Sequence, residues 1–169
     1  MLGSEYCIDK LRVMHFVNCQ MTNISGPESV KVFQAAGDGL RKVNLSHNRI
    51  QSVPHGFFQI CTKIESLILA HNQIAAIPWT LSLLTNMTEC DLSGNRLTDE
   101  ALESATFPRS IKVLNLAKNQ SLTRVPAWIY DSKVLETVDL SENKLRNWNE
   151  QSVNFRQCVI RHFDVSNNA

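Results

Sequence analysis

The sequence predicts an α/β repeat solenoid, in which short strands form a parallel sheet on the concave side of a curved stack. Three observations predict this fold: a recurring apolar frame, a polar residue that ends each copy, and a nearly constant step between copies. The connections between strands are too short for long helices, so we expect short helical, 3₁₀ or irregular segments on the convex side. Residues 1–169 are one domain, long enough to bury a core.

The recurring frame reads apolar-x-x-apolar-x-apolar-x-x-Asn. It begins near residues 11, 40, 64, 87, 111, 135 and 160, which makes seven copies. The column that ends the frame contains Cys19, Asn48, Asn72, Asn95, Asn119, Asn143 and Asn168. Steps along this column are 29, 24, 23, 24, 24 and 25 residues. A step this regular indicates a repeat protein.

Each copy contains two apolar residues that are two positions apart, such as Val43 and Leu45. On a strand these two side chains point to one side, and the residue between them points to the other. A single copy cannot bury its apolar side alone, so the copies must stack. The Asn side chain carries a donor and an acceptor, and we expect it to satisfy backbone groups of adjacent turns. Cys19 can do this only weakly, as befits a less regular first copy.

The pattern resembles the leucine-rich repeat family, whose consensus is LxxLxLxxN/CxL, over nearly the whole chain from Leu11 to Asn168. The resemblance implies a curved horseshoe. It also implies that the concave sheet is the ligand surface, because that sheet is rigid and broad.

Two connections carry helix signals. "SGPESVKVFQAAGDG" has a helix start at Ser25 or Gly26, a Pro in the first turn and a stop at Gly37. "TDEALESATF" predicts a short helix with Thr98 as its N-cap. One extra residue before Leu122 predicts a small bulge beside the concave edge. The three tryptophans are expected to pack on the convex side or at the core edge; they are Trp79, Trp128 and Trp148.

Composition excludes several functions. The net charge of +1 gives no general attraction to nucleic acid or to an anionic membrane. No apolar run is long enough to span a bilayer. The sequence contains no Gly-rich phosphate loop, no GxSxG and no HExxH. We therefore expect a protein that is not an enzyme and that needs no cofactor or metal.

The concave columns supply the candidate partner-binding residues. Lysine and histidine fall in the first half of the surface, whereas acidic residues dominate the second half. Ile68 is an apolar residue in an outward column; one exposed Ile is ordinary, but it also suits a partner's anchor point. The predicted partner-binding set is Lys42, Asn44, His47, Ile68, His71, Glu89, Asp91, Asn115, Asp139 and Asp164.

Two subsets of this surface have alternative interpretations. His47 and His71 should lie about 5 Å apart, so they are either a metal-bridging pair or, as we favour, two solvated side chains. The second subset has three interpretations: a cation site, a docking surface for a basic partner or a solvated acidic stripe. It consists of the outward residues Asp91, Asn115, Asp139 and Asp164. We favour the solvated stripe.

The sequence therefore predicts a non-catalytic protein–protein interaction module, a cytoplasmic scaffold whose protein partner it does not identify. The alternative is the ligand-recognition or regulatory segment of a larger signalling protein, with a kinase, GTPase or other domain outside this chain. The seventh copy has its strand and Asn168 but no convex return. We expect a chain cut from a longer protein, or else self-association through the uncapped C-terminal repeat, which a concentration-dependent mass measurement would reveal.

The five cysteines are widely spaced and form no CxxC or Cys/His metal pattern; they are Cys7, Cys19, Cys61, Cys90 and Cys158. This usage predicts reduced thiols in the cytoplasm. Titration of the denatured, unreduced protein is expected to count all five thiols. A lower count would contradict the cytoplasmic assignment.

Overall fold

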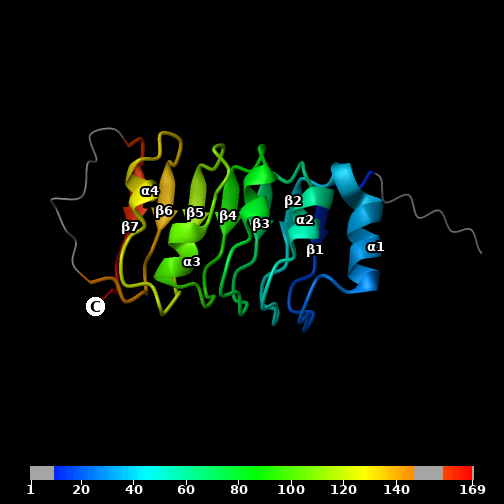
Figure 1. Ribbon diagram of the computed structural model, residues 1–169, viewed down its shortest axis with the longest axis horizontal. Helices are drawn as coiled ribbons and strands as arrows, with labels where there is room; N and C mark the ends of the chain where they lie inside the picture. The colour runs from blue at the N-terminus through cyan, green and yellow to red at the C-terminus, as the bar shows by residue number, and fades with distance from the viewer. Residues whose placement is uncertain (1–9, 147–157, 169) are drawn as a thin grey trace, which may run out of the picture.

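The computed structural model describes residues 10–146 and 158–168. Within these residues, seven three-residue strands form one parallel sheet in chain order. The strands are β1 (Val13–His15), β2 (Lys42–Asn44), β3 (Ser66–Ile68), β4 (Glu89–Asp91), β5 (Val113–Asn115), β6 (Thr137–Asp139) and β7 (His162–Asp164). Figure 1 shows them side by side along the long axis of the molecule. The predicted repeat solenoid is confirmed.

Short helices lie in front of this sheet in Figure 1, on the convex side. They are α1 (Pro27–Ala36), η1 (Gly37–Gly39), α2 (His55–Ile60), η2 (Trp79–Leu83), α3 (Asp99–Ser104) and α4 (Ala127–Tyr130), of which η1 and η2 are 3₁₀ helices. No helix among the described residues is both long and apolar enough to cross a membrane. The predicted mixture of short helical, 3₁₀ and irregular connections is confirmed.

Both predicted helices form for the expected reasons. Helix α1 follows Gly26, and at its end the amide of Gly37, at φ +28°, donates to the Phe33 carbonyl. Helix α3 follows Thr98, whose hydroxyl accepts the Ala101 amide at 3.2 Å. That cap satisfies one of the amide groups that a helix start leaves without an intrahelical partner.

The core is a continuous apolar column because the strands pair without a shift in register. The central residues of β2, β3 and β4 (Val43, Leu67 and Cys90) are aligned partners, and each is at most 1% exposed. In the last repeat Phe163 and Val165 pack against this core but stay partly exposed.

The Asn column joins each repeat to the preceding one. The Asn72 amide group donates to the carbonyls of Leu45 and Leu69, both at 3.0 Å, and its Oδ1 accepts the Ile50 amide at 2.9 Å. Asn95 and Asn119 repeat this arrangement one and two turns later. The predicted role of the column, satisfying backbone groups of adjacent turns, is confirmed.

The first repeat lacks an Asn at this place and relies on its neighbour. The Oδ1 of Asn48 accepts two amides, those of Cys19 and Met21, each at 3.0 Å. The Asn48 amide group donates to the Phe16 carbonyl at 2.6 Å.

The predicted bulge is present in the fifth repeat, and one hydrogen bond of the Asn column is missing there. The extra residue lets the Leu122 amide bond the Asn119 carbonyl at 2.9 Å. In a regular copy that amide would donate to Asn143, as Leu97 does to Asn119. Within the described chain, the Asn143 Oδ1 is the one buried side-chain polar atom without a hydrogen-bond partner.

We expect Asn95→Ala to lower the free energy of unfolding more than Asn143→Ala, by about 1–3 kcal/mol. Both changes remove bonds to three carbonyls. Only Asn95→Ala also strands a buried amide, that of Ile74, which donates to the Asn95 Oδ1. Urea denaturation measures the difference. Asn86→Ala, at an exposed loop position, is the control and should change stability by less than about 0.5 kcal/mol. Equal costs for Asn95→Ala and Asn143→Ala would contradict this account.

Candidate partner-binding surface

The strand register places the predicted residues in aligned columns on one face of the sheet. The central outward column contains His15, Asn44, Ile68, Asp91, Asn115, Asp139 and Asp164. Lys42 and Glu89 lie in the column before it, and His47 and His71 follow at the strand exits. All ten predicted residues therefore lie on the concave sheet or at its exit edge.

Most of the central column has a structural task that the sequence interpretation missed. Each Asn or Asp in it accepts, through Oδ1, the backbone amide two residues later, at 2.8–3.0 Å. The five residues are Asn44, Asp91, Asn115, Asp139 and Asp164. The bonds form Asx turns, which carry the chain out of each strand. The recurrence of Asn or Asp two residues before a Ser or Ala was the signal available in the sequence.

Ile68 is the exception on the inner strands of the sheet. Its aligned neighbours are Asn44 on β2 and Asp91 on β4, and both form the turn bond. An Ile side chain has no acceptor, so the Ala70 amide cannot donate a turn bond of this kind. Ile68 is partly exposed, with an apolar side chain where its neighbours have oxygen atoms.

Three aspartates in the acidic half of the surface have no salt-bridge partner within the described part of the chain. Among the described residues, Asp91, Asp139 and Asp164 form no ion pair with a Lys, Arg or His side chain. Hydrogen bonds from the backbone and side chain of Ser166 hold the pKa of Asp164 below its ordinary value. The Asp164 carboxyl group is therefore held in its charged form.

His47 and His71 stack on each other at the strand exits. Their ring centroids are 4.5 Å apart and the rings are inclined by 18°, close to the predicted spacing. In nearly parallel rings the nitrogen lone pairs lie in separate planes and do not converge on one ion. No group of three or more metal-ligating side chains lies close together within the described residues.

Gly94 continues this stack. A Cβ at Gly94 would lie 2.6 Å from the Nδ1 of His71. Backbone geometry alone does not require glycine, because Lys118 and Glu142 hold the equivalent positions at φ 59° and 54°. The requirement comes instead from the His71 ring, which occupies the space that a side chain would take.

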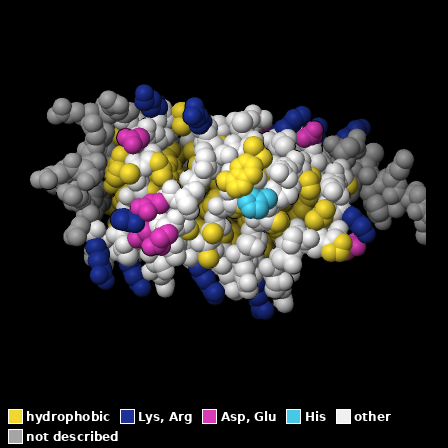
Figure 2. Space-filling view, viewed as in Figure 1, with side chains coloured by type: hydrophobic (Ala, Val, Ile, Leu, Met, Phe, Trp, Pro, Cys, Tyr) yellow, Lys and Arg dark blue, Asp and Glu magenta, His cyan; other side chains and the backbone are white. Residues whose placement is uncertain are grey.

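The convex side carries the described tryptophans. Trp79 is 58% exposed, and its ring centroid lies 6.0 Å from that of His55. Trp128 is partly buried and its indole N–H donates to the Leu102 carbonyl at 3.2 Å. Figure 2 shows hydrophobic side chains gathered on this side. The predicted convex placement is confirmed for both residues, and Trp148 lies outside the described residues.

The described cysteines carry no disulfide; Cys7 lies outside the described residues. Cys61 and Cys90 are buried, and Cys19 is exposed. Burial, with a smaller contribution from Asp38, raises the pKa of Cys61 to about 12. Burial likewise raises the pKa of Cys90 well above its ordinary value, with Asp91 adding to the effect. Neither buried thiol is therefore a ready nucleophile, because the thiolate is the reactive form.

Comparison with known proteins finds similarity to leucine-rich repeat proteins. The sequence model described as "Leucine rich repeat" matches residues 38–97. Fibromodulin from Oryctolagus cuniculus is 30% identical over 129 residues, which cover 76% of this chain and 86% of the relative's sequence. Podocan-like protein 1 from Homo sapiens is 31% identical over 139 residues, 80% of this chain. The chain spans only 25% of that relative's length.

A solved internalin structure from Listeria monocytogenes has the same fold. It superposes with a TM-score of 0.63 at 19% identity, over 82% of this chain and 38% of the internalin chain. At this identity the likeness concerns the fold alone.

We expect Gly94→Ala to lower the free energy of unfolding by about 2 kcal/mol and to displace the His71 ring from His47. About half of that cost is the strain of Ala at positive φ, and the remainder is the contact with His71. In a His71→Ala background the same substitution should cost only about 1 kcal/mol. A double-mutant cycle by urea denaturation measures the coupling, and imidazole NMR shifts report the stack. Equal costs in both backgrounds would rule out the steric explanation.

Proposed function

Because this chain belongs to the leucine-rich repeat family, we propose that it is a non-catalytic module that binds a protein partner through its concave sheet. Proteins of this family are typically interaction modules, some of them within larger receptors. The observation that carries the proposal is Ile68, an apolar side chain in a column where the other residues of the inner strands form turn bonds.

Ile68 gives up a local hydrogen bond worth about 1 kcal/mol, and its side chain stays partly exposed. A partly exposed apolar side chain on a rigid sheet, with Asn44 and Asp91 on either side, has the layout of a binding hot spot with a polar rim. We infer that an apolar side chain of the partner packs against it.

The charges suggest how the partner lies on the sheet. Asp139 and Asp164 are adjacent in register at the C-terminal end and are unpaired among the described residues. Lys42 lies toward the opposite end, on β2. A partner segment with basic residues over β6 and β7 and an apolar residue over β3 complements both features.

Ile68→Asn separates binding from folding. The Asn should accept the Ala70 amide as its column neighbours do, so the free energy of unfolding should stay within about 1 kcal/mol of the parent value. The loss of the apolar side chain should weaken partner binding about tenfold or more. Quantitative pull-down from the source cell identifies proteins retained by the parent chain, and titration with the purified partner gives the affinities.

Glu103→Gln on convex helix α3 is the matched control and should leave partner binding unchanged. If the Ile68→Asn protein retains the same proteins with the same affinity while folded, the concave site centred on Ile68 is wrong.

Asp139→Asn combined with Asp164→Asn tests the charge of the partner. An Asn keeps the Oδ1 acceptor, so both Asx turns survive while two charges are lost. We expect binding to weaken about three- to tenfold and to become less sensitive to salt. The matching pair Glu28→Gln and Glu100→Gln, on convex helices α1 and α3, should change neither property. A partner that binds the Asp139→Asn/Asp164→Asn protein more tightly would have to be acidic, contrary to the proposal.

A second candidate is the recognition segment of a larger signalling protein whose kinase, GTPase or other domain lies outside this chain. The observation that favours it is the similarity to the probable serine/threonine-protein kinase pats1 from Dictyostelium discoideum, 29% identical over 137 residues, in which the matching segment is 4% of the length. Sequencing the transcript beyond Ala169 tests it. A continuing reading frame that encodes a catalytic domain supports this candidate. An immediate stop codon excludes a catalytic domain after Ala169.

A further inference from the structure

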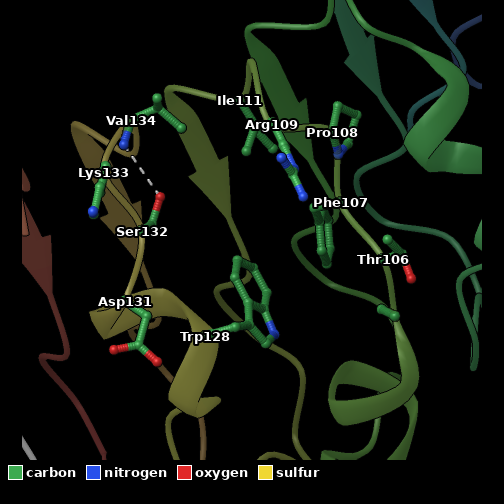
Figure 3. A pocket seen from close by; sticks show the side chains of 11 residues that line it. Thr106, Phe107, Pro108, Arg109, Ile111, Trp128, Asp131, Ser132, Lys133 and Val134 are labelled. Atoms are coloured by element: carbon green, nitrogen blue, oxygen red, sulfur yellow. Dashed lines mark hydrogen bonds between the residues drawn. The ribbon is translucent and has the colours of Figure 1, made fainter.

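We propose that a hollow on the convex side, between the segments that follow α3 and α4, binds a small aromatic anion. The hollow has a volume of about 520 Å³, within the range of small-ligand sites. Residues 105–109 and Ile111 form one side, and Trp128 with residues 131–134 forms the other. Figure 3 shows these side chains around the opening.

The floor of the hollow is aromatic and held in place. The rings of Phe107 and Trp128 stack with centroids 4.9 Å apart and planes inclined by 28°. The indole N–H of Trp128 donates to the Leu102 carbonyl, which orients its ring. Pro108 and Ile111 are buried beside them. Both aromatic rings remain partly exposed, so a flat ring can pack on them without a rearrangement of the core.

The charges at the opening favour an anion. Arg109 and Lys133 are exposed and line the hollow, together with one acidic residue, Asp131. Among the described residues none of these three groups forms an ion pair. In Figure 3 the Arg109 side chain extends toward Phe107, whereas Asp131 and Lys133 lie beyond Trp128 on the other side. The cation that extends toward the aromatic floor in Figure 3 is therefore a guanidinium, which binds a carboxylate in two parallel hydrogen bonds.

Arg109 and Lys133 differ in their ion pairing from two cations of the same repeats. The neighbouring Lys112 pairs with Glu136 at 3.0 Å, and Arg124 pairs with Glu103 at 2.8 Å. Arg109 and Lys133 thus lie beside an apolar hollow without the cross-repeat partners that nearby cations have. An aromatic ring that carries a carboxylate can pack against the aromatic floor and bind Arg109 through its carboxylate at the same time.

Three probes of the same shape test the charge requirement on the full chain: naphthalene-2-carboxylate, naphthalene-2-carboxamide and 2-naphthylmethylamine. Titrations followed by ¹H–¹⁵N NMR report the Trp128 indole and the backbone amide of Arg109. We expect both signals to shift, and the carboxylate to bind about tenfold more tightly than the carboxamide. The amine should bind most weakly.

Arg109→Gln should remove the preference for carboxylate over carboxamide and leave the carboxamide affinity unchanged. Arg96→Gln is the control, because Arg96 is exposed, forms no ion pair within the described residues and lies outside the hollow. Phe107→Leu keeps the site apolar but removes a ring, and should weaken all three probes.

The proposal is overturned by equal affinity for the three probes, by tighter binding of the amine, by shifts that map elsewhere, or by an Arg109→Gln protein that keeps the preference. The hollow lies on the side opposite the concave sheet, so these results are independent of Ile68→Asn and its partner.

Discussion

The buried Asn column is the interaction on which the solenoid depends. Each strand has only three residues, so the sheet alone offers few backbone hydrogen bonds per repeat. A side chain such as Asn95 adds bonds to the carbonyls of its own turn and of the preceding one, and accepts an amide of the preceding turn. In a buried position these backbone groups would otherwise go without partners, at about 1–3 kcal/mol each. The column therefore couples each repeat to the one before it.

That coupling also fixes what the concave side can present. Because the column holds the strand exits in register, the outward residues align from β1 to β7. Most of the central column serves the turn that follows, as Asp91 does for Ser93. In each of these Asn and Asp side chains the Oδ1 atom accepts the backbone amide two residues later. The stripe of Asn and Asp side chains that resembles a docking site in the sequence is thus partly a set of turn caps. Ile68 differs from its neighbours because its side chain has no acceptor for the turn amide.

The fifth repeat contains an extra residue, and it shows which contact of the Asn column is lost when the repeat length changes. One added residue before Leu122 is absorbed by a tight turn to Asn119, so the sheet register on either side is preserved. The cost falls on Asn143, whose Oδ1 loses its donor. Downstream of this turn lies the connection to Trp128, one side of the aromatic hollow. The extra residue beside the concave edge is tolerated because it follows the strand and leaves the pairing of β5 with β6 unchanged.

The sequence by itself determined the fold, the seven-copy register, both helices with cap signals and the position of the bulge, because each is written in local residue types at a regular step. It also placed the ten candidate residues on one face, since side chains alternate along a strand. Tertiary structure alone decided which of them cap turns and why Gly94 must be small, because those facts depend on atoms in neighbouring repeats. It also decided that Phe107 and Trp128, 21 positions apart, form one aromatic floor. Their stacking requires the convex segments of two repeats to pack together, and the frame of apolar and Asn positions does not specify how those segments pack.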